Sequence, residues 1–377
     1  KETLRRPMTC VNPGLDRWVV TVKCGDHSDL KPWEDGYAAV KRQLGEWTVT
    51  IEGWEDTYIS WLHDARIKVR VKDDVNNALD SGAELLARWA ATPDANLTAR
   101  DRKTLEKAAE TMADASLSAE DRLAAGDNPR IATLHDTHPL RDGISPSQPQ
   151  RFKVERPKSS FAAWYQFFPR SEGATINPAT GKIVQGTLKT SMAGLERAAA
   201  EGFDIVYLPP IFPIGVTNRK GRNNSLIAGP DDPGSPFGIG SELGGHDTVD
   251  PLLGTMDDFK ALCQRAHELG LEIALDFALQ CSPDHPWVKA HPAWFKHKPD
   301  DTIAFAENPP KKYQDIYPID FNADMAGIEK EVERIMNLWI EAGVTIFRID
   351  NPHTKPVRFW QDVIAAVTKK HPEILFL

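Results

Sequence analysis

The sequence predicts an α/β protein: a (β/α)8 TIM-barrel domain, preceded by a β-sandwich domain with a helical insert. Two observations carry this prediction. In the second half of the chain, short apolar strands alternate with amphipathic helices, the pattern of parallel βα units. In residues 1–72, apolar and polar side chains alternate instead, as they do in half-buried antiparallel strands.

The first domain is expected at residues 1–72 and to be a partial β-sandwich. Period-two alternation is clear in residues 17–22 and 45–54, and a third candidate strand covers residues 65–71. Because three strands are few for a sandwich, the sequence indicates only part of one.

Residues 73–150 are expected to form a helical domain followed by a linker. Segments 77–91 and 98–125 are rich in Ala, Leu, Glu and Arg, with apolar residues three or four apart. Segment 141–157 has no such period and contains several Pro and Ser residues, which is typical of a linker.

Residues 151–377 are expected to form the first part of the barrel. The predicted strands and helices are strands 163–168, 204–209, 271–276, 344–350 and 374–377, and helices 188–202, 256–269, 325–342 and 357–369. Helix 325–342 carries a single apolar stripe, as a helix that covers a parallel sheet does. Five strands are visible, whereas a closed barrel needs eight.

The composition is that of an ordinary globular protein, with 41% apolar and 26% charged residues among 377. A net charge of −9 and the lack of a basic block argue against nucleic acid or an anionic membrane as partner. No apolar run approaches the roughly 20 residues that span a bilayer. Four scattered cysteines, Cys10, Cys24, Cys263 and Cys281, favour reduced thiols in a cytoplasmic protein.

Asp350 is the strongest candidate for a catalytic residue. It ends strand 344–350, and functional groups of such barrels sit at the C-terminal ends of strands. A lone Asp there more often caps a helix or holds a turn. However, Arg348 points to the same side of the strand, where its charge would keep the carboxylate ionised and competent as a nucleophile.

Three polar loops are further candidates. Asp276 ends the third strand and opens a long excursion, here called loop domain B (281–320), and long loops at barrel tops are usually functional. Its segment 307–315 is either a solvated Lys-rich turn or part of a site. The basic loop 217–224 suits an anionic ligand, or is a plain surface loop. A metal site is not favoured, because His246–Asp247 and Asp284–His285 are sequence neighbours rather than a spaced ligand set.

Together these segments resemble the α-amylase superfamily (glycoside hydrolase family 13), and more closely its maltosyltransferase family. Segments 246–255, 276–285 and 347–350 resemble superfamily motifs, and segments 167–173, 219–224, 307–317 and 350–356 resemble those of the maltosyltransferases. The resemblance runs from about residue 17 to residue 377.

The resemblance implies transfer of maltosyl units from α-maltose 1-phosphate to the non-reducing end of α-1,4-glucans, with release of phosphate, by a retaining double displacement. It implies glycogen or α-glucan biosynthesis, a homodimer, and no cofactor or metal. By this resemblance Asp350 is the nucleophile and Arg348 orients it. The implied substrate-binding residues are Lys220, Gln280, Asp315 and Asn351, and the implied phosphate-binding residues are Asn308, Lys311 and Tyr313.

The resemblance also places the general acid/base Glu just beyond the fifth strand, past Leu377. We therefore expect a partial chain that is inactive alone. Two alternatives stay open. One is an α-amylase-type hydrolase, which would use water as acceptor and need no anion-binding groups. The other is an inactive glucan-binding fragment.

Overall fold

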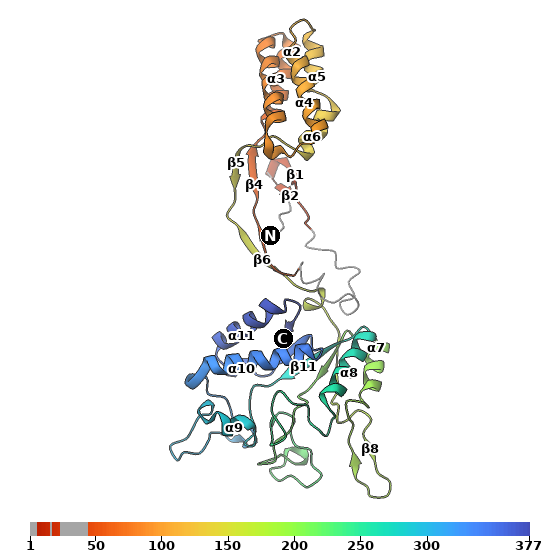
Figure 1. The fold of residues 1–377 in the computed structure, drawn as a ribbon, viewed down its shortest axis with the longest axis vertical. Helices are drawn as coiled ribbons and strands as arrows, with labels where there is room; N and C mark the ends of the chain where they lie inside the picture. The colour runs from red at the N-terminus through yellow and green to blue at the C-terminus, as the bar shows by residue number, and fades with distance from the viewer. Residues whose placement is uncertain (1–5, 16, 23–43) are drawn as a thin grey trace. The chain divides into compact units, whose positions relative to one another are not determined.

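The computed structural model describes residues 6–15, 17–22 and 44–377 (Figure 1). These residues fall into two compact units. The first contains residues 46–152 with the described residues up to 22, and the second contains residues 153–377 with the described residues 44 and 45. Among the described residues, no helix is both long and apolar enough to cross a membrane. Cys10, Cys263 and Cys281 are free thiols, while Cys24 lies outside the described residues.

The strands of the first unit pair two by two. They are β1 (Thr9–Asn12), β2 (Arg17–Val19), β3 (Gly45–Val49), β4 (Glu52–Glu55), β5 (Asp142–Pro146) and β6 (Gln150–Val154). β1 pairs with β2, β3 with β6, and β4 with β5. The packing of two sheets into a sandwich stays a prediction.

The expected linker at 141–157 is wrong, because β5 and β6 lie inside it. Their partners β4 and β3 begin 90 and 105 residues earlier in the chain (142 − 52 and 150 − 45), which no local pattern could indicate. Asp142, the first residue of β5, is held by both guanidinium nitrogens of Arg88, at 2.7 and 2.8 Å, and by Thr57 Oγ1 at 3.0 Å.

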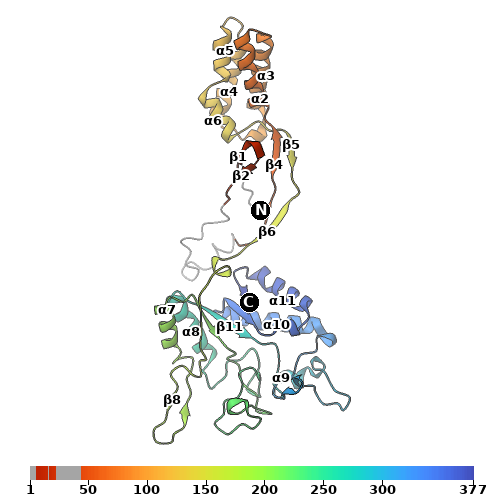
Figure 2. The ribbon, with the colours of Figure 1, turned by 180° about the vertical axis from the view of Figure 1, so that it is seen from behind.

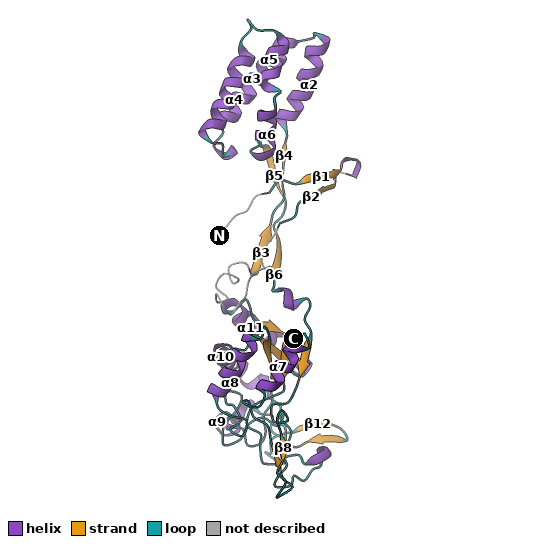
Figure 3. Ribbon diagram, turned by 90° about the vertical axis from the view of Figure 1, so that its right-hand side faces the viewer, coloured by secondary structure: helices purple, strands orange, loops and turns teal. Residues whose placement is uncertain are grey.

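Five helices form the rest of this unit (Figure 3): α2 (Thr57–Val71), α3 (Val75–Ala91), α4 (Ala99–Ala113), α5 (Ala119–Gly126) and α6 (Pro129–Thr137). The strand expected at 65–71 is wrong, because those residues end α2. The buried residues Tyr58, Leu62, Ala65 and Val69 recur every three or four positions, which is a helical spacing. The side chain of Asp56 caps the helix by accepting from the N–H of Ile59 at 3.1 Å.

The second unit is built on a five-stranded parallel sheet. Its strands are β7 (Trp164–Gln166), β10 (Ile205–Leu208), β11 (Glu272–Phe277), β14 (Ile346–Ile349) and β15 (Leu375–Phe376). Their spatial order, β7-β10-β11-β14-β15, is their order in the chain, and every neighbouring pair is parallel. All five predicted strands are therefore confirmed as strands of one parallel sheet, and closure into an eight-stranded barrel stays a prediction.

Four helices connect these strands: α7 (Met192–Ala200), α8 (Met256–Glu268), α10 (Phe321–Glu341) and α11 (Val357–Lys370). α7 lies beside α8 and α10 beside α11, in both views (Figures 1 and 2). Shorter elements lie in the connections: hairpin strands β8 (Thr175–Ile176) and β9 (Ile183–Val184), helix α9 (Pro286–Ala290), hairpin strands β12 (Ala306–Asn308) and β13 (Lys311–Tyr313), and the 3-10 turns η4 (Arg222–Asn224), η5 (Pro292–Trp294) and η6 (Pro352–Thr354). The 3-10 turns η1 (Pro13–Leu15) and η2 (Pro93–Ala95) belong to the first unit, and η3 (Pro157–Ser159) precedes β7.

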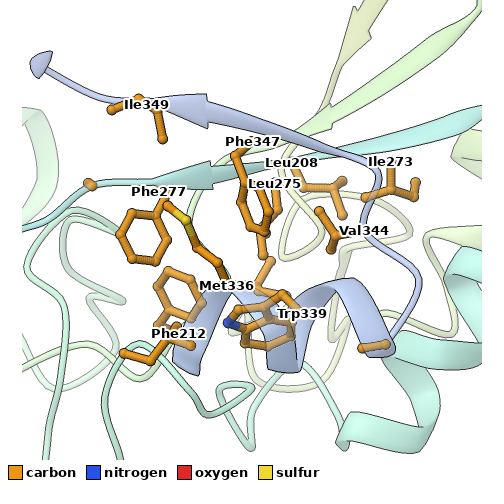
Figure 4. Close-up of a cluster of buried hydrophobic side chains, with 14 of the residues drawn as sticks. Leu208, Phe212, Ile273, Leu275, Phe277, Met336, Trp339, Val344, Phe347 and Ile349 are labelled. Carbon is orange, nitrogen blue, oxygen red and sulfur yellow. The ribbon is translucent and has the colours of Figure 1, made fainter. Parts of the chain in front are cut away.

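The two faces of the sheet differ in what they bury. One face packs Leu275, Phe277 and Phe347 against Met336 and Trp339 of α10 (Figure 4). The opposite face, here called the inner face, starts with the small apolar cluster Ile205, Ala274, Ile346 and Leu375. Because side chains alternate along a strand, the residues two positions further on point the same way. This alternation places the polar side chains Tyr207, Asp276 and Arg348 on the inner face, toward the C-terminal ends of their strands.

Candidate active site

A cluster of two carboxylates and one guanidinium lies at the C-terminal ends of β11 and β14. Nη1 of Arg348 donates to Oδ2 of Asp276 at 2.8 Å and to Oδ1 of Asp350 at 2.6 Å. The hydroxyl of Tyr207, from β10, donates to the same Oδ2 of Asp276. Three neighbouring strands therefore converge on one buried carboxylate.

The strand register explains this convergence. Asp276 is paired with Arg348 in the parallel ladder, so the two side chains leave adjacent strands at the same level. The N–H of Asp350 donates to the carbonyl of Phe277 at 3.2 Å, which extends the ladder by one step and fixes where β14 ends. Arg348 lies against the ring of Tyr207, with its Cζ 5.8 Å from the ring centroid.

Burial and charge act differently on the two carboxylates. Asp276 is fully buried, and desolvation raises the pKa of its carboxyl to about 6, although Tyr207 and Arg348 oppose that rise. Its Oδ1 has no hydrogen-bond partner within the described part of the chain. The side chain of Asp350, by contrast, keeps 14% of its surface exposed. Asp350 is the carboxylate of the cluster that a ligand can reach.

Both carboxylate oxygens of Asp350 are held. Oδ1 accepts from Arg348, and Oδ2 accepts from Nδ2 of Asn351 at 2.9 Å. Asn351 adopts a left-handed backbone with φ of 47°, a conformation that Asn tolerates better than most residues. Lys355 donates to the carbonyl of Asn351 at 3.3 Å, and burial lowers the pKa of this Lys to about 8. This turn presents the carboxylate in a fixed direction.

Lys220 and Asp315 form a second, enclosed polar pair. Lys220 Nζ lies 4.0 Å from Asp315 Oδ1 and donates to Gln314 Oε1 at 3.2 Å. Both line a narrow crevice, which Gly215 and Ser282 also line. Burial raises the pKa of the Asp315 carboxyl, and within the described residues its Oδ1 accepts no hydrogen bond.

Gln280 follows Asp276 in the loop after β11. Its Nε2 donates to the carbonyl of Phe237 at 3.0 Å, so the side-chain amide already has a fixed direction. The remaining sequence candidates, Asn308, Lys311 and Tyr313, lie on the β12–β13 hairpin of loop domain B, where Asn308 pairs with Lys311. Among the described contacts, none joins this hairpin to Asp350, so its predicted role stays untested.

Sequence reasoning did not single out Tyr207 or Lys355, although both lie at this cluster. Tyr207 could have been found from strand periodicity, because it stands two residues after the inward-facing Ile205. Lys355 carried no such signal, since it belongs to the irregular segment after the strand.

A parallel βα sheet with a partly exposed carboxylate at its C-terminal strand ends, fixed by Arg and Asn, is the arrangement in which α/β enzymes place their catalytic groups. Residues 1–156 match the family model described as "Alpha-1,4-glucan:maltose-1-phosphate maltosyltransferase, domain N/S". Proteins of that name are similar along the whole chain. The one from Bifidobacterium longum is 92% identical over 377 residues, covering 100% of this chain and 50% of that protein.

A second relative of that name, from Bifidobacterium animalis subsp. lactis, is 72% identical and covers 99% of this chain and 51% of that protein. One from Streptomyces coelicolor is 49% identical and covers 98% and 51%. The chain is therefore similar to these maltosyltransferases over nearly its whole length, and it spans about half the length of the curated relatives it matches. Among solved structures, an α-amylase from Lactobacillus plantarum is 30% identical, covering 57% of this chain and 44% of that chain, with a TM-score of 0.46.

Proposed function

We propose that this chain supplies the nucleophile of a retaining maltosyltransferase, which moves maltosyl units from α-maltose 1-phosphate to the non-reducing end of α-1,4-glucans. The observation that carries the proposal is 92% identity over all 377 residues to a Bifidobacterium longum protein named for that reaction. The Asp350 cluster supports it chemically, because a fixed and partly exposed carboxylate is what the first displacement needs.

In the first step an oxygen of Asp350 attacks the anomeric carbon. The bond from that carbon to the phosphate oxygen breaks, phosphate leaves with the bonding electrons, and a β-maltosyl ester of Asp350 forms. In the second step the 4-hydroxyl of a glucan chain attacks the same carbon, and the ester carboxylate leaves. The proton of that hydroxyl passes to the general base, which the resemblance places beyond Leu377. Two inversions give net retention.

Arg348 holds the carboxylate of Asp350 in position for the substrate. Its own pKa is lowered by burial, but its bonds to Asp350 and Asp276 outweigh that effect and raise the pKa overall. Because Oδ1 of Asp350 stays bound to Arg348, Oδ2 is the better placed attacking atom. Asn351 must then release Oδ2, and we propose that its amide turns to the bound substrate instead.

The remaining roles follow the family resemblance. Lys220, Gln280 and Asp315 would bind maltosyl hydroxyls, and Asn308, Lys311 and Tyr313 would bind the departing phosphate, which needs a cation and directed donors. We also propose a closed eight-stranded barrel, a homodimer, a place in glycogen or α-glucan biosynthesis, and a cytoplasmic location. No metal or cofactor takes part in this mechanism.

The test uses a protein here called the hybrid, in which this chain replaces the 377 residues that it matches in the Bifidobacterium longum relative. The hybrid should release phosphate from α-maltose 1-phosphate only when an α-1,4-glucan is present, and should lengthen that glucan. The 377 residues alone should release none. Maltose formed from starch without any phosphate donor would replace the proposal by the amylase-type hydrolase. Glucan binding with no turnover would favour a binding protein.

A mechanism-based probe separates the nucleophile from its neighbours. A 2-deoxy-2-fluoro maltosyl fluoride slows both displacements, so a covalent intermediate accumulates. Mass spectrometry of the hybrid should find one added 2-fluoro-maltosyl group on the peptide that contains Asp350. Label on a peptide that lacks Asp350 would contradict the assignment.

A further inference from the structure

Two buried histidines and a cysteine meet at the loop that follows β11, which carries Cys281 and His285, while His246 comes from the connection before α8. His246, Cys281 and His285 are 1%, 0% and 2% exposed, and one ligand atom of each lies within 4.8 Å of the others. The proposed mechanism uses none of the three. Their meeting also departs from the sequence analysis, in which both histidines had only sequence neighbours as possible co-ligands.

The hydrogen bonds around the two rings determine where every ring proton lies. The N–H of Trp287 donates to Nδ1 of His285 at 3.0 Å, so this nitrogen carries no proton. Nε2 of His285 must then carry one, and it donates to Nδ1 of His246 at 3.1 Å. Nε2 of His246 therefore carries the next proton and donates to the carbonyl of Ala278 at 2.9 Å. The three hydrogen bonds therefore donate in one direction, from Trp287 through His285 and His246 to Ala278.

Both rings are neutral in this arrangement. Burial lowers the pKa of His246 to about 4 and that of His285 to about 2. An added proton on either Nδ1 would face an N–H group that already donates to it. The same argument disfavours a metal ion, because Nε2 of His285 offers a proton rather than a lone pair. Burial also raises the pKa of the Cys281 thiol.

The last of these hydrogen bonds, from His246 to the carbonyl of Ala278, holds the start of the loop that carries Gln280. The carbonyl of Ala278 accepts from Nε2 of His246 and also from the N–H of Gln280, at 2.9 Å each. Both bonds converge on one carbonyl oxygen two residues after Asp276. A small shift of His246 would therefore move the start of the Gln280 loop.

His246 is itself braced from three sides. Its ring stacks on that of Trp287 at 5.1 Å with 17° between the planes. The indole N–H of Trp339, from α10, donates to its backbone carbonyl at 2.8 Å. The ring of Phe212 lies 5.6 Å away. The side chain of His246 is therefore held in one orientation, and it can hold the groups that it contacts in place.

We propose that His246 is a positioning residue for saccharide binding, which fixes the turn 278–280 so that Gln280 presents its amide to the donor sugar. His285 acts through His246 by setting its tautomer. This inference rests on the proposed function, in which Gln280 binds a maltosyl hydroxyl.

The test compares isosteric variants of the hybrid. His246→Phe keeps the stacked ring but removes both nitrogens. His246→Gln keeps a donor near the position of Nε2. His285→Asn keeps the acceptor for the N–H of Trp287 but removes the proton that faces His246. The exposed His63 on α2 supplies a matched control, His63→Gln.

His246→Phe should raise the KM for α-maltose 1-phosphate by roughly tenfold, the lower end of what outer-shell partners of a site typically contribute, with a much smaller change in kcat. His246→Gln should recover most of that loss, and His285→Asn should show a smaller rise in KM. A second readout is a double-mutant cycle with Gln280→Ala, in whose background His246→Phe should add little.

A KM within about twofold of the parent for His246→Phe, or a full and additive effect in the Gln280→Ala background, would overturn the inference. A purely structural role would lower Tm and kcat alike and leave the two substitutions independent. If the parent hybrid releases no phosphate, the proposed function fails. The dissociation constants of maltose for the same variants then decide the positioning role.

Discussion

The two ends of strand β11 carry the same chemistry in opposite settings. At its start, Glu272 accepts from Nη1 of Arg156 at 2.6 Å, and Lys158 lies 3.2 Å away. Near its end, Asp276 accepts from Arg348 at 2.8 Å. The side chain of Arg156 at the start is 5% exposed, whereas that of Arg348 at the end is 38% exposed. One arginine–carboxylate cluster is sealed and the other is open.

Charge balance decides how each carboxylate titrates. Burial alone would raise the pKa of Glu272, but the cations Arg156 and Lys158 outweigh it and lower that pKa. Asp276 shares its single cation with Asp350, so burial prevails and the pKa rises to about 6. We infer that the sealed cluster stabilises the fold. In the open cluster one cation faces two carboxylates, and a carboxyl with a raised pKa at the C-terminal end of a parallel strand is typical of a functional site.

The largest expected effect is on activity at the open end. Asp350→Asn in the hybrid removes the proposed nucleophile and should lower kcat by at least about 10⁴-fold. Its Tm should change little, because the side chain is partly exposed and Asn keeps its shape. The matched control is Asp362→Asn on α11, which should keep full activity. Residual activity within about a hundredfold of the parent would show that Asp350 is not the nucleophile.

A substitution at the sealed end should lower the free energy of unfolding rather than the activity. Glu272→Gln leaves Arg156 buried without its counter-charge, which typically costs about 3 kcal/mol or more in the free energy of unfolding. The value of kcat, measured well below Tm, should stay near that of the parent. Urea unfolding of the hybrid measures the loss, and the exposed Glu268→Gln serves as control. A fall in kcat without a fall in stability would reverse the contrast between the two ends.

The pH dependence of stability should have opposite signs at the two ends. The folded pKa of Asp276, about 6, lies above the ordinary Asp value near 4, so the folded state binds more protons between them. Asp276 therefore costs the folded state stability as pH rises from about 4 to 6, on the order of 2 kcal/mol. The lowered pKa of Glu272 means that its contribution is present above its unfolded pKa and is lost as pH falls.

Urea unfolding at several pH values checks this prediction. Relative to the parent hybrid, Asp276→Asn should gain stability as pH rises from 4 to 6 and then level off. Glu272→Gln should lose relative stability as pH rises through the acidic range. If the two variants show parallel pH profiles, both carboxylates titrate alike and the predicted difference in sign is wrong.

Strand periodicity alone predicts much of the cluster at the C-terminal end of β11. Arg348 and Asp350 are two residues apart at the end of a strand, so their meeting was predictable, and so was the place of each barrel strand. The second partner of Arg348 was not, because Asp276 lies 72 residues earlier and only the parallel register brings them level. The hydrogen bond between His246 and His285 was missed because the two residues are 39 positions apart and lie in separate loops.

The first unit shows where local pattern fails. Ile67, Val69 and Val71 alternate as in a strand, yet they end helix α2, where Ile67 and Val71 are 38% and 58% exposed. Alternation over so few residues fits either period, and the cap at Asp56 decides for the helix. Strands β5 and β6 were missed because their partners are distant in the sequence.

The smallest expected effect tests the hydroxyl that supports Asp276. Tyr207→Phe removes the donor to Oδ2 but keeps the ring beside Arg348. Loss of one such bond should cost about 1 kcal/mol, with Arg348 still bound to the same oxygen.

Because the Tyr207 hydrogen bond lowers the pKa of Asp276, its loss should move that pKa further upward. The pH at which the stability difference between Tyr207→Phe and its Asp276→Asn double variant levels off should therefore lie above 6. Tyr317→Phe in loop domain B is the control and should leave that pH unchanged. If this pH lies below 6 instead, the Tyr207 hydroxyl destabilises the charged carboxylate of Asp276, and Arg348 alone stabilises it.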